Sequence, residues 1–531
     1  MHPAAPPTRS LPVLTLLALL LLLSASAFSQ DVLTYHNNNS RNGLDNVEKI
    51  LTKSNVNSAQ FGKLFTLPAD GLVDAEPLYL SAVSVAGVTH NLVIVASEHD
   101  TVYAYDADTG ASIWQITTLK SGETTSDTRR CSQVSPEIGI TSTPVITRPK
   151  TGNPVIYVVA MSKDSSKNYH QRLHALDATT GAELYGGPVD ITGTYPGTGD
   201  NSSGGNVIFD PAQYKERAGL LLMGSTVYLG WASHCDFRPY TGWIMGYNTT
   251  TLKQTSILNV TPNGNEGAIW GAGAGMAGDG NGNIFLLDAN GVFDTTLNSS
   301  GFPSQGDYGN GFLRVSVKGG LAVADYFEMD NEASENGGDV DLGSGGALLL
   351  SQKDSSGKTW QLAVGAGKDS NLYVVDRTNM GKFNSSSNNV YQELAGALPG
   401  GIWSAPASYN GSVFFGPVGS ALLKFQFSNA KLLTTAVAKT ANSFGYPGTS
   451  PSISANAGAN GIVWATENTN PAVLHAYDAK TLNELYNTNQ AANGRDHFGN
   501  GNKFITPMIA NGKVYVGTTT GVGVFGLLST K

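Results

Sequence analysis

Short segments of alternating apolar and polar residues, rich in Val, Ile, Tyr and Thr, recur along the chain. Segments 101–106, 171–177 and 473–478 are three examples, and each of them ends in Asp. The pattern Asp-x-x-Thr-Gly begins at the end of the first two, and it forms a turn in which Asp bonds the backbone and Gly takes a positive φ. Alternation bounded by turn residues predicts β-strands joined by tight turns.

These strands are parts of a longer repeat. A small residue followed by Pro opens an apolar strand upstream of the strand that ends in Asp, as at 143–144, 405–406, 450–451 and 506–507. In chain order, the unit comprises this strand A, a Gly/Asn turn, a β-branched strand B, strand C ending in Asp, and strand D. Eight such units begin near Glu76, Thr141, Ala218, Trp270, Leu342, Trp403, Thr449 and Ile505. Their spacing of about 40 to 75 residues is compatible with propeller blades that carry insertions.

The two ends of this repeat fit a closed ring. The last unit has only three strands, the final one at 522–528, and segment 62–67 stands alone before the first unit. Placing that segment in the last unit as its fourth strand leaves no open edge between the termini. We therefore predict an all-β fold, an eight-bladed β-propeller closed by an N-terminal strand in the last blade. It forms one domain over 61–531, after an N-terminal extension over 28–60.

The motif text resembles a known family. The run Val102-Tyr-Ala-Tyr-Asp-Ala-Asp-Thr-Gly110, followed by Trp114, is similar to the PQQ-repeat, quinoprotein-like β-propellers. That family includes the quinoprotein alcohol dehydrogenases and an outer-membrane-assembly lipoprotein. Segments 136–144, 341–346 and 366–376 resemble a group of secreted bacterial members. The resemblance implies the fold, and it implies two different activities that are weighed below.

The N-terminus and the charge restrict where the protein works. The apolar run Leu11 to Leu23 follows Arg9 and precedes Ala25 and Ala27, which is typical of a signal peptide over residues 1–27. The run has 13 residues, fewer than the roughly 20 that span a bilayer, and no Cys follows it that could carry a lipid anchor. We expect a secreted or periplasmic monomer that is not embedded in a membrane. The net charge of −9, without a basic cluster, argues against nucleic acid as a partner.

Candidate chemistry gathers on one face of the predicted propeller. The Asp residues that end strand C, Asp106, Asp177 and Asp478, fall in turns of the bottom face, and we interpret them as structural. The loops of the top face carry Glu98, His99, Asp100, Glu137, Lys368, Asp369 and Arg495. Trp270, Trp403 and Phe504 stand just before strand A of their units, near the mouth of the axial channel. Two interpretations of these rings stay open, a platform on which a ligand stacks and packing between blades.

Metal chemistry has one candidate segment. Residues 328–341 contain six acidic side chains, and hard cations need several oxygen ligands. A cation site and a mobile, solvated loop are the two alternatives, and the loop is favoured. The sequence contains no His pair at metal-ligand spacing, so we assign no metal ligands.

Two functions from different classes remain. The enzyme hypothesis follows from the resemblance: PQQ stacked on Trp270 or Trp403, Ca²⁺ held by carboxylates, an Asp or Glu as base, and an alcohol or sugar as substrate. The family's alcohol dehydrogenases carry an adjacent Cys-Cys pair over the cofactor, and this chain lacks it, as it lacks a Cys-x-x-Cys-His haem motif. We therefore favour a scaffold that binds a small molecule, a glycan or a protein in its top-face funnel.

The two cysteines of the chain, Cys131 and Cys235, are predicted to form a disulfide. An exported protein meets an oxidising compartment, where an even number of cysteines tends to pair. Cys131 falls in the loop between the first and second units and Cys235 in a loop of the third. Both loops belong to the predicted top face, so the thiols can meet across the second blade.

Overall fold

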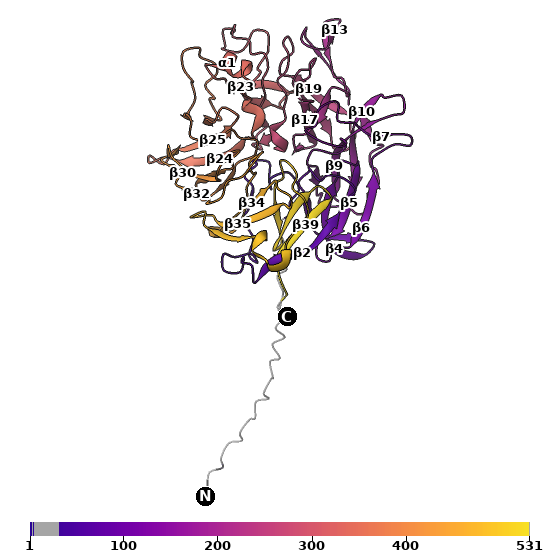
Figure 1. The fold of residues 1–531 in the computed structure, drawn as a ribbon, viewed down its shortest axis with the longest axis vertical. Helices are drawn as coiled ribbons and strands as arrows, with labels where there is room; N and C mark the ends of the chain where they lie inside the picture. The colour runs from indigo at the N-terminus through magenta and orange to yellow at the C-terminus, as the bar shows by residue number, and fades with distance from the viewer. Residues whose placement is uncertain (3, 5–30, 530–531) are drawn as a thin grey trace.

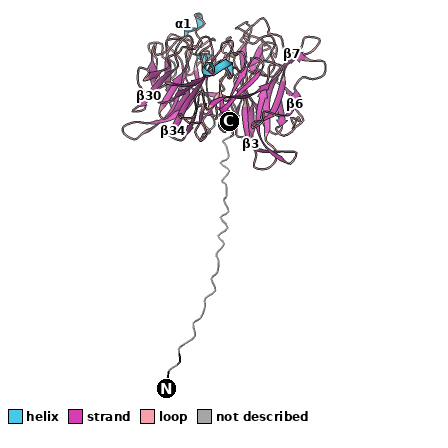
Figure 2. Cartoon of the chain, turned by 60° about the horizontal axis from the view of Figure 1, so that its bottom comes forward, coloured by secondary structure: helices cyan, strands magenta, loops and turns pink. Residues whose placement is uncertain are grey.

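The computed structural model describes residues 1–2, 4 and 31–529, and within them the protein is built of β-strands. The only α-helix of this described part is α1 (Glu332–Gly337); four 3-10 turns cover Gly271–Gly273, Leu342–Ser344, Thr488–Gln490 and Ala492–Gly494. Strands fill the body of the molecule in Figure 2, with α1 at its upper edge. No helix in the described residues has the length and apolar character needed to cross a membrane. The predicted signal peptide lies almost entirely outside the described residues.

The strands form nine sheets, eight of which have four or five strands. The first contains β3 (Leu78–Val85), β4 (Val88–Ala96), β5 (Thr101–Asp106) and β6 (Ser112–Thr117). The second contains β7 (Thr124–Thr125), β8 (Val145–Thr147), β9 (Val155–Lys163), β10 (Tyr169–Asp177) and β11 (Val189–Asp190). The third contains β15 (Tyr214–Glu216), β16 (Leu221–Met223), β17 (Thr226–Ser233), β18 (Trp243–Asn248) and β19 (Gln254–Asn259). The fourth contains β20 (Ala277–Gly278), β21 (Asn283–Leu287), β22 (Phe312–Ser316) and β23 (Ala322–Phe327).

The remaining large sheets continue the series along the chain. The fifth contains β24 (Leu348–Lys353), β25 (Thr359–Ala366), β26 (Leu372–Asp376) and β27 (Gln392–Leu394). The sixth contains β28 (Ala407–Tyr409), β29 (Ser412–Phe415), β30 (Leu423–Ser428), β31 (Lys431–Leu432) and β32 (Ala438–Lys439). The seventh contains β1 (Leu44–Asp45), β33 (Ser452–Asn456), β34 (Ala459–Glu467), β35 (Val473–Asp478) and β36 (Glu484–Asn487). The eighth contains β2 (Phe61–Pro68), β37 (Met508–Ala510), β38 (Lys513–Thr518) and β39 (Gly521–Leu527).

The ninth sheet is small and is inserted between the second and third. It contains β12 (Thr194–Pro196), β13 (Ser202–Ser203) and β14 (Asn206–Ile208). The unit pattern does not predict it, because its strands have only two or three residues and lack the repeated turn motif.

The large sheets follow one another around the molecule in chain order (Figure 1). The series ends at β39, which pairs antiparallel with β2 from Phe61↔Leu527 to Pro68↔Gly521. The prediction that the N-terminal segment supplies the fourth strand of the last unit is therefore confirmed. The pairing joins the first and last parts of the chain within one sheet.

The repeated turn motif has the predicted local structure. Asp106 Oδ1 accepts from the backbone N–H and the hydroxyl of Thr109, and Gly110 has φ +75°. The tryptophan of the motif links neighbouring sheets, because Trp114 Nε1 donates to Ala178 O at 2.9 Å. A Cβ atom at Gly181 would lie 2.8 Å from that indole. The motif therefore encodes both a turn and a contact between consecutive units.

The segment before β2 holds the sheets together from within. Residues 31–48 make hydrogen bonds to all eight large sheets or their turns. These bonds join Val32 to Tyr79, Leu33 to Ile146, Asn39 to Leu222 and Gly278, Ser40 to Leu349, Asn42 to Ser408, Gly43 to Ile453, and Glu48 to Gly512. The extension that the sequence analysis set apart from the domain thus packs against every repeated unit.

Candidate functional site

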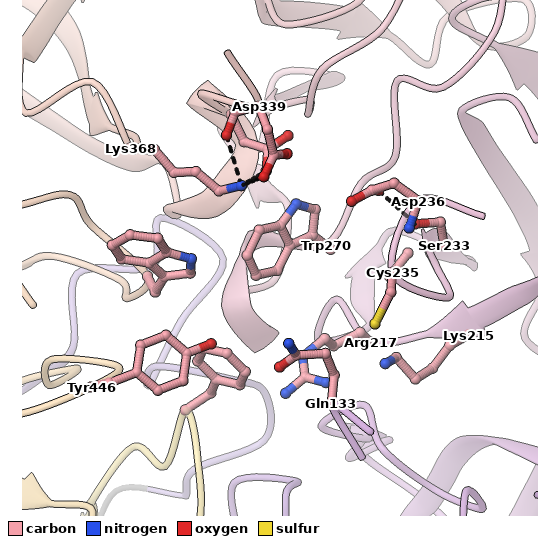
Figure 3. A pocket seen from close by; sticks show the side chains of 14 residues that line it. Gln133, Lys215, Arg217, Ser233, Cys235, Asp236, Trp270, Asp339, Lys368 and Tyr446 are labelled. Atoms are coloured by element: carbon pink, nitrogen blue, oxygen red, sulfur yellow. Dashed lines mark hydrogen bonds and ion pairs between the residues drawn. The ribbon is translucent and has the colours of Figure 1, made fainter. Parts of the chain in front are cut away.

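A pocket of about 210 Å³ lies where loops and strand ends of successive sheets meet. Figure 3 shows its side chains converging from several ribbons on one space. The lining side chains are Gln133, Lys215, Arg217, Ala232, Ser233, Cys235, Asp236, Trp270, Asp339, Asp341, Lys368, Trp403, Tyr446 and Phe504. A second, narrower space continues from it along Arg217 and Phe504 to Tyr35 of the N-terminal segment.

Four aromatic rings form one wall of the pocket. The ring centroids of Trp270 and Phe504 are 6.3 Å apart, those of Phe504 and Tyr446 6.5 Å, and those of Tyr446 and Trp403 6.1 Å. All three pairs meet edge to face, the arrangement that ring quadrupoles favour. The two tryptophans are half-buried, and they line the pocket and contact other rings of the same wall. The wall is therefore open to a ligand as well as packed.

Two cations occupy one end of the pocket. Lys215 in β15 and Arg217 just after it are only 3% and 4% exposed, and alternation along the strand places both on the same side. The Arg217 guanidinium lies over the Phe504 ring, 4.4 Å from its centroid. Within residues 31–529, neither side chain forms an ion pair with a carboxylate. Burial and the neighbouring Arg217 lower the pKa of Lys215 to about 7.

The opposite end of the pocket is acidic and internally paired. Lys368 Nζ lies 2.7 Å from Asp341 Oδ2 and 3.1 Å from Asp339 Oδ2. Dashed lines mark ion pairs of Lys368 in Figure 3. Burial raises the pKa of Asp341 to about 6, although Lys368 opposes the shift. Asp236 accepts hydrogen bonds from Ser233 at 2.9 Å and from Tyr240 at 2.8 Å. The pocket thus has a cationic end and an end where acids predominate, with Trp270 between them in Figure 3.

Three of the nine predicted site residues, Trp270, Trp403 and Lys368, line the pocket. Glu98 lies deeper, fully buried, and its Oε2 accepts from the Gly139 N–H at 2.8 Å and from the Thr141 hydroxyl at 3.0 Å. Burial and the nearby Asp74 raise the pKa of Glu98 well above its usual range. Glu98 and Asp74 lie near Lys215 and Arg217, and their negative charge acts to raise the pKa of both cations.

Four further candidates, His99, Asp100, Glu137 and Asp369, lie outside the pocket lining. His99 Nδ1 is 2.9 Å from Glu137 Oε1, at a partly exposed position. Asp100 is buried, and burial raises the pKa of its carboxyl well above the usual range. Asp369 accepts from the Tyr373 hydroxyl at 2.7 Å.

Arg495, the last of the predicted top-face residues, makes its contacts away from the pocket lining. Arg495 pairs with its neighbour Asp496 through two nitrogens and donates to the carbonyls of Ser58 and Phe61. The last of these belongs to β2, the strand at the outer end of its sheet. The loop that carries Arg495 therefore folds outward over that strand, away from the pocket.

The acidic segment 328–341 is folded rather than a solvated loop, which corrects the favoured interpretation. It contains α1, and Glu328, Glu332 and Asp341 are all buried. Asp341 contributes to the pocket through its ion pair with Lys368. In the part of the chain that the structure describes, no three His, Cys, Asp or Glu residues are grouped so that they could hold a metal ion.

The disulfide prediction is confirmed. Cys131 and Cys235 are bonded, with their Cα atoms 5.5 Å apart. The bond joins the loop after β7 to the loop after β17, and Cys235 lines the pocket beside the cationic end. It therefore fixes one side of the pocket wall.

Sequence reasoning missed most of the charged lining, namely Lys215, Arg217, Asp236, Asp339 and Asp341 as pocket residues. The third unit was placed from Ala218 onward, so the short strand β15 before it was not considered. The alternation of Lys215 and Arg217 is the sequence signal that could have placed both side chains on one side of a strand. In the structure that strand is β15, which pairs with β17 as β16 does.

Comparisons with known proteins agree with this architecture. Residues 69–192 match the family model described as "Outer membrane protein assembly factor BamB", of the PQQ_2 repeat. A comparison with curated protein sequences finds no match. Among solved structures, the quinohemoprotein alcohol dehydrogenase from Comamonas testosteroni is similar with a TM-score of 0.60 and 14% identity, over 94% of this chain and 80% of that one. The alcohol dehydrogenase ADHIIG from Pseudomonas putida HK5 gives 0.62 and 14%, over 94% and 81%.

A europium-containing methanol dehydrogenase is also similar, with a TM-score of 0.59 and 14% identity over 92% of this chain and 89% of that one. At this level of identity the likeness concerns the fold, not the activity. The resemblance inferred from the repeat motifs is confirmed, and the chain has an all-β fold similar to the propellers of PQQ-repeat, quinoprotein-like proteins.

Proposed function

We propose that this protein is an eight-bladed propeller scaffold that binds a small organic anion with a planar ring in its axial pocket. The observation that carries the proposal is the pair Lys215 and Arg217, buried at the pocket without a carboxylate ion pair in the described residues. A buried charge without a partner is costly, and a bound anion would offset that cost.

The rest of the lining supports a ligand with a ring and a second polar group. Trp270, Trp403 and Phe504 supply flat apolar surfaces for a ring. The Arg217 guanidinium, already held over Phe504, presents its planar donors to a carboxylate. At the far end, Asp236 and the Lys368 pair can accept from or donate to a hydroxyl or carbonyl group of the ligand.

The blade count and the closed ring belong to the same proposal. The eight large sheets correspond one to one with the eight sequence units, and the β2–β39 pairing joins the ends. Residues 31–48 run across the sheets beyond the narrow end of the pocket, where Tyr35 lies. The pocket then opens only on the face that carries Lys368 and Trp403.

A quinone-dependent dehydrogenase is the second candidate, favoured by the similarity to alcohol and methanol dehydrogenases. PQQ is a planar polyacid, and the aromatic wall with Lys215 and Arg217 fits such a molecule; when bound it would supply two-electron redox chemistry. The Ca²⁺ half of that chemistry has less support, since no three His, Cys, Asp or Glu residues are grouped in the described residues so that they could hold a metal ion. Lys215 and Arg217 would hold acid groups of the quinone, and Asp341 could take up a substrate proton on Oδ2.

The test is calorimetric titration of the purified protein with naphthalene-2-carboxylate and with its uncharged amide. We expect the carboxylate to bind and the amide to bind at least about tenfold more weakly, the effect of losing one charged hydrogen bond of about 1.5–3 kcal/mol. Arg217→Met should remove the difference, whereas Arg148→Met, on the exposed surface, should keep it. Equal binding of acid and amide to the wild type would disprove the anion site.

The same preparation separates the two candidates. Titration with PQQ, with and without Ca²⁺, followed by dye reduction in the presence of alcohols and sugars, reports redox activity directly. Dye reduction that depends on PQQ and substrate would establish the dehydrogenase. Binding of PQQ without any turnover would leave the scaffold as the function.

A further inference from the structure

We propose that Lys215 is a nucleophilic amine that forms a reversible imine with its ligand, so that the pocket takes an aldehyde, ketone or quinone that also carries an acid group. The inference rests on the proposed function, since it concerns the same pocket and adds the class of ligand. Figure 3 shows the Lys215 side chain reaching from its strand toward Arg217 and Gln133. Its amine therefore faces the space where the ligand's acid group would lie.

Lys215 has no carboxylate counter-ion paired with it in the described residues. Lys215 is 3% exposed and makes no ion pair in residues 31–529, and after burial the neighbouring cation Arg217 has the largest effect in lowering its pKa. Of the acids in its surroundings, Glu98 has a pKa raised well above its usual range by burial and by Asp74, which disfavours its charged form, and Asp74 accepts a hydrogen bond from Asn502. Burial beside a second cation lowers the pKa of Lys215 to about 7, so near neutral pH a substantial fraction of this side chain is the neutral amine, the form that attacks carbonyls.

His234 belongs to the surroundings of Lys215. Its Nε2 lies 3.2 Å from the Tyr214 carbonyl oxygen, and a carbonyl oxygen only accepts, so Nε2 carries the proton. Nδ1 is then unprotonated, and it is buried without a hydrogen-bond partner in the described residues. Burial and Lys215 lower the pKa of His234 to about 3, so this ring stays neutral.

Lys368 gives the contrast within the same pocket. Its amine is paired with Asp341 at 2.7 Å and with Asp339 at 3.1 Å. Burial lowers the pKa of Lys368, but the two carboxylates outweigh it and raise that pKa. Lys368 therefore stays an ammonium, which is not a nucleophile, and the pocket offers one reactive amine and one fixed cation.

The step balances without an added oxidant or reductant. The Lys215 nitrogen forms a bond to the carbonyl carbon, the π pair of the C–O bond moves to the oxygen, and one of the two N–H protons passes to that oxygen to give the carbinolamine. The C–O bond of the carbinolamine then breaks, and the hydroxyl takes the remaining N–H proton and leaves as water to give the imine. Arg217 would hold the acid group of the ligand meanwhile, and water reverses the reaction.

The test is reductive trapping with 4-formylbenzoate and cyanoborohydride at pH 7, followed by peptide mapping. An ordinary lysine, with a pKa of about 10.4, is less than about one part in a thousand neutral at this pH. We therefore expect a carboxybenzyl group on Lys215 at least about tenfold faster than on Lys368 or on the exposed Lys353. Lys215→Arg should abolish this fast labelling, Lys353→Arg should leave it unchanged, and naphthalene-2-carboxylate should slow it.

Labelling of Lys215 no faster than of Lys353 in the wild type would overturn the inference. Calorimetry with 4-(hydroxymethyl)benzoate, which has the ring and the acid but no carbonyl, separates this failure from failure of the pocket itself. If this alcohol binds and Lys215 is not trapped, the anion site stands and the imine falls. If the alcohol does not bind and Lys215 is not trapped, both fall.

Discussion

Arg41 offers a sharp test of how the N-terminal segment stabilises the sheets. Its guanidinium is 1% exposed and donates to the carbonyls of Met276 at 2.9 Å, Leu220 at 3.0 Å and Tyr35 at 2.8 Å, and to the Thr34 hydroxyl at 2.7 Å. Arg41→Met keeps most of the volume and removes every donor. Leaving buried carbonyls unpaired costs about 1–3 kcal/mol each, and relief from burying the charge offsets part of this. We therefore expect a loss of about 3–5 kcal/mol in the free energy of unfolding.

The assay is urea unfolding followed by tryptophan fluorescence, with Arg148→Met as the matched control. Arg148 also pairs with the N-terminal segment, through Asp31, but its side chain is 31% exposed. An exposed pair contributes at most about 1 kcal/mol, so the control should unfold close to the wild type. If Arg41→Met were as stable as Arg148→Met, the segment would be a surface strap and the argument from its buried hydrogen bonds would be refuted.

Three further predictions concern the closure, the disulfide and pH. Deleting residues 31–68 should leave a chain that trypsin degrades quickly, and a deletion variant with an unchanged melting temperature would contradict this. Thiol labelling of the unfolded, unreduced protein should find no free thiol. Replacing both cysteines with Ser removes the cross-link from the unfolded chain, so it should lower the free energy of unfolding, measured in urea, by up to about 4 kcal/mol. Burial lowers the pKa of His475, but Glu467 and Glu484 outweigh burial and raise that pKa in the folded protein. The ion pairs of His475 therefore stabilise the fold below about pH 6.5, and this stabilisation is lost as pH rises through the pKa of His475 in the folded protein. His475→Gln should flatten this decline in melting temperature.

Much of the fold could be predicted because its information is local and repeated. The turn at Asp106, the glycine after it and the contact of Trp114 with the next sheet all lie within one unit and its neighbour. The strand at 62–67 was found for a different reason, since counting strands in the last unit left one missing. The segment over residues 31–48 has no repeat, and its contacts pass from one sheet to the next along the chain, so no periodic signal marks it.

The site was predicted only where position within the unit determines it. Trp270, Trp403 and Phe504 precede the innermost strands, so the repeat alone places them at the channel. Loop residues are not fixed in this way. Arg495 and Lys368 stand in comparable top-face loops, yet Arg495 points outward and Lys368 points into the pocket. Each side chain is oriented by the carboxylate with which it pairs, Asp496 for Arg495 and Asp341 for Lys368.

Lys215 and Arg217 show why charge on an inner strand carries more information than charge in a loop. In sequence the run Lys215-Glu216-Arg217 is typical of a solvated edge, and only the pairing of β15 with Trp231, Ala232 and Ser233 shows that it is buried. An apolar pair of similar volume at these positions would stabilise the fold at least as well, because burying charge without a partner is unfavourable. The cations are therefore not explained by stability, and a ligand that supplies the missing negative charge explains both their burial and their lack of partners.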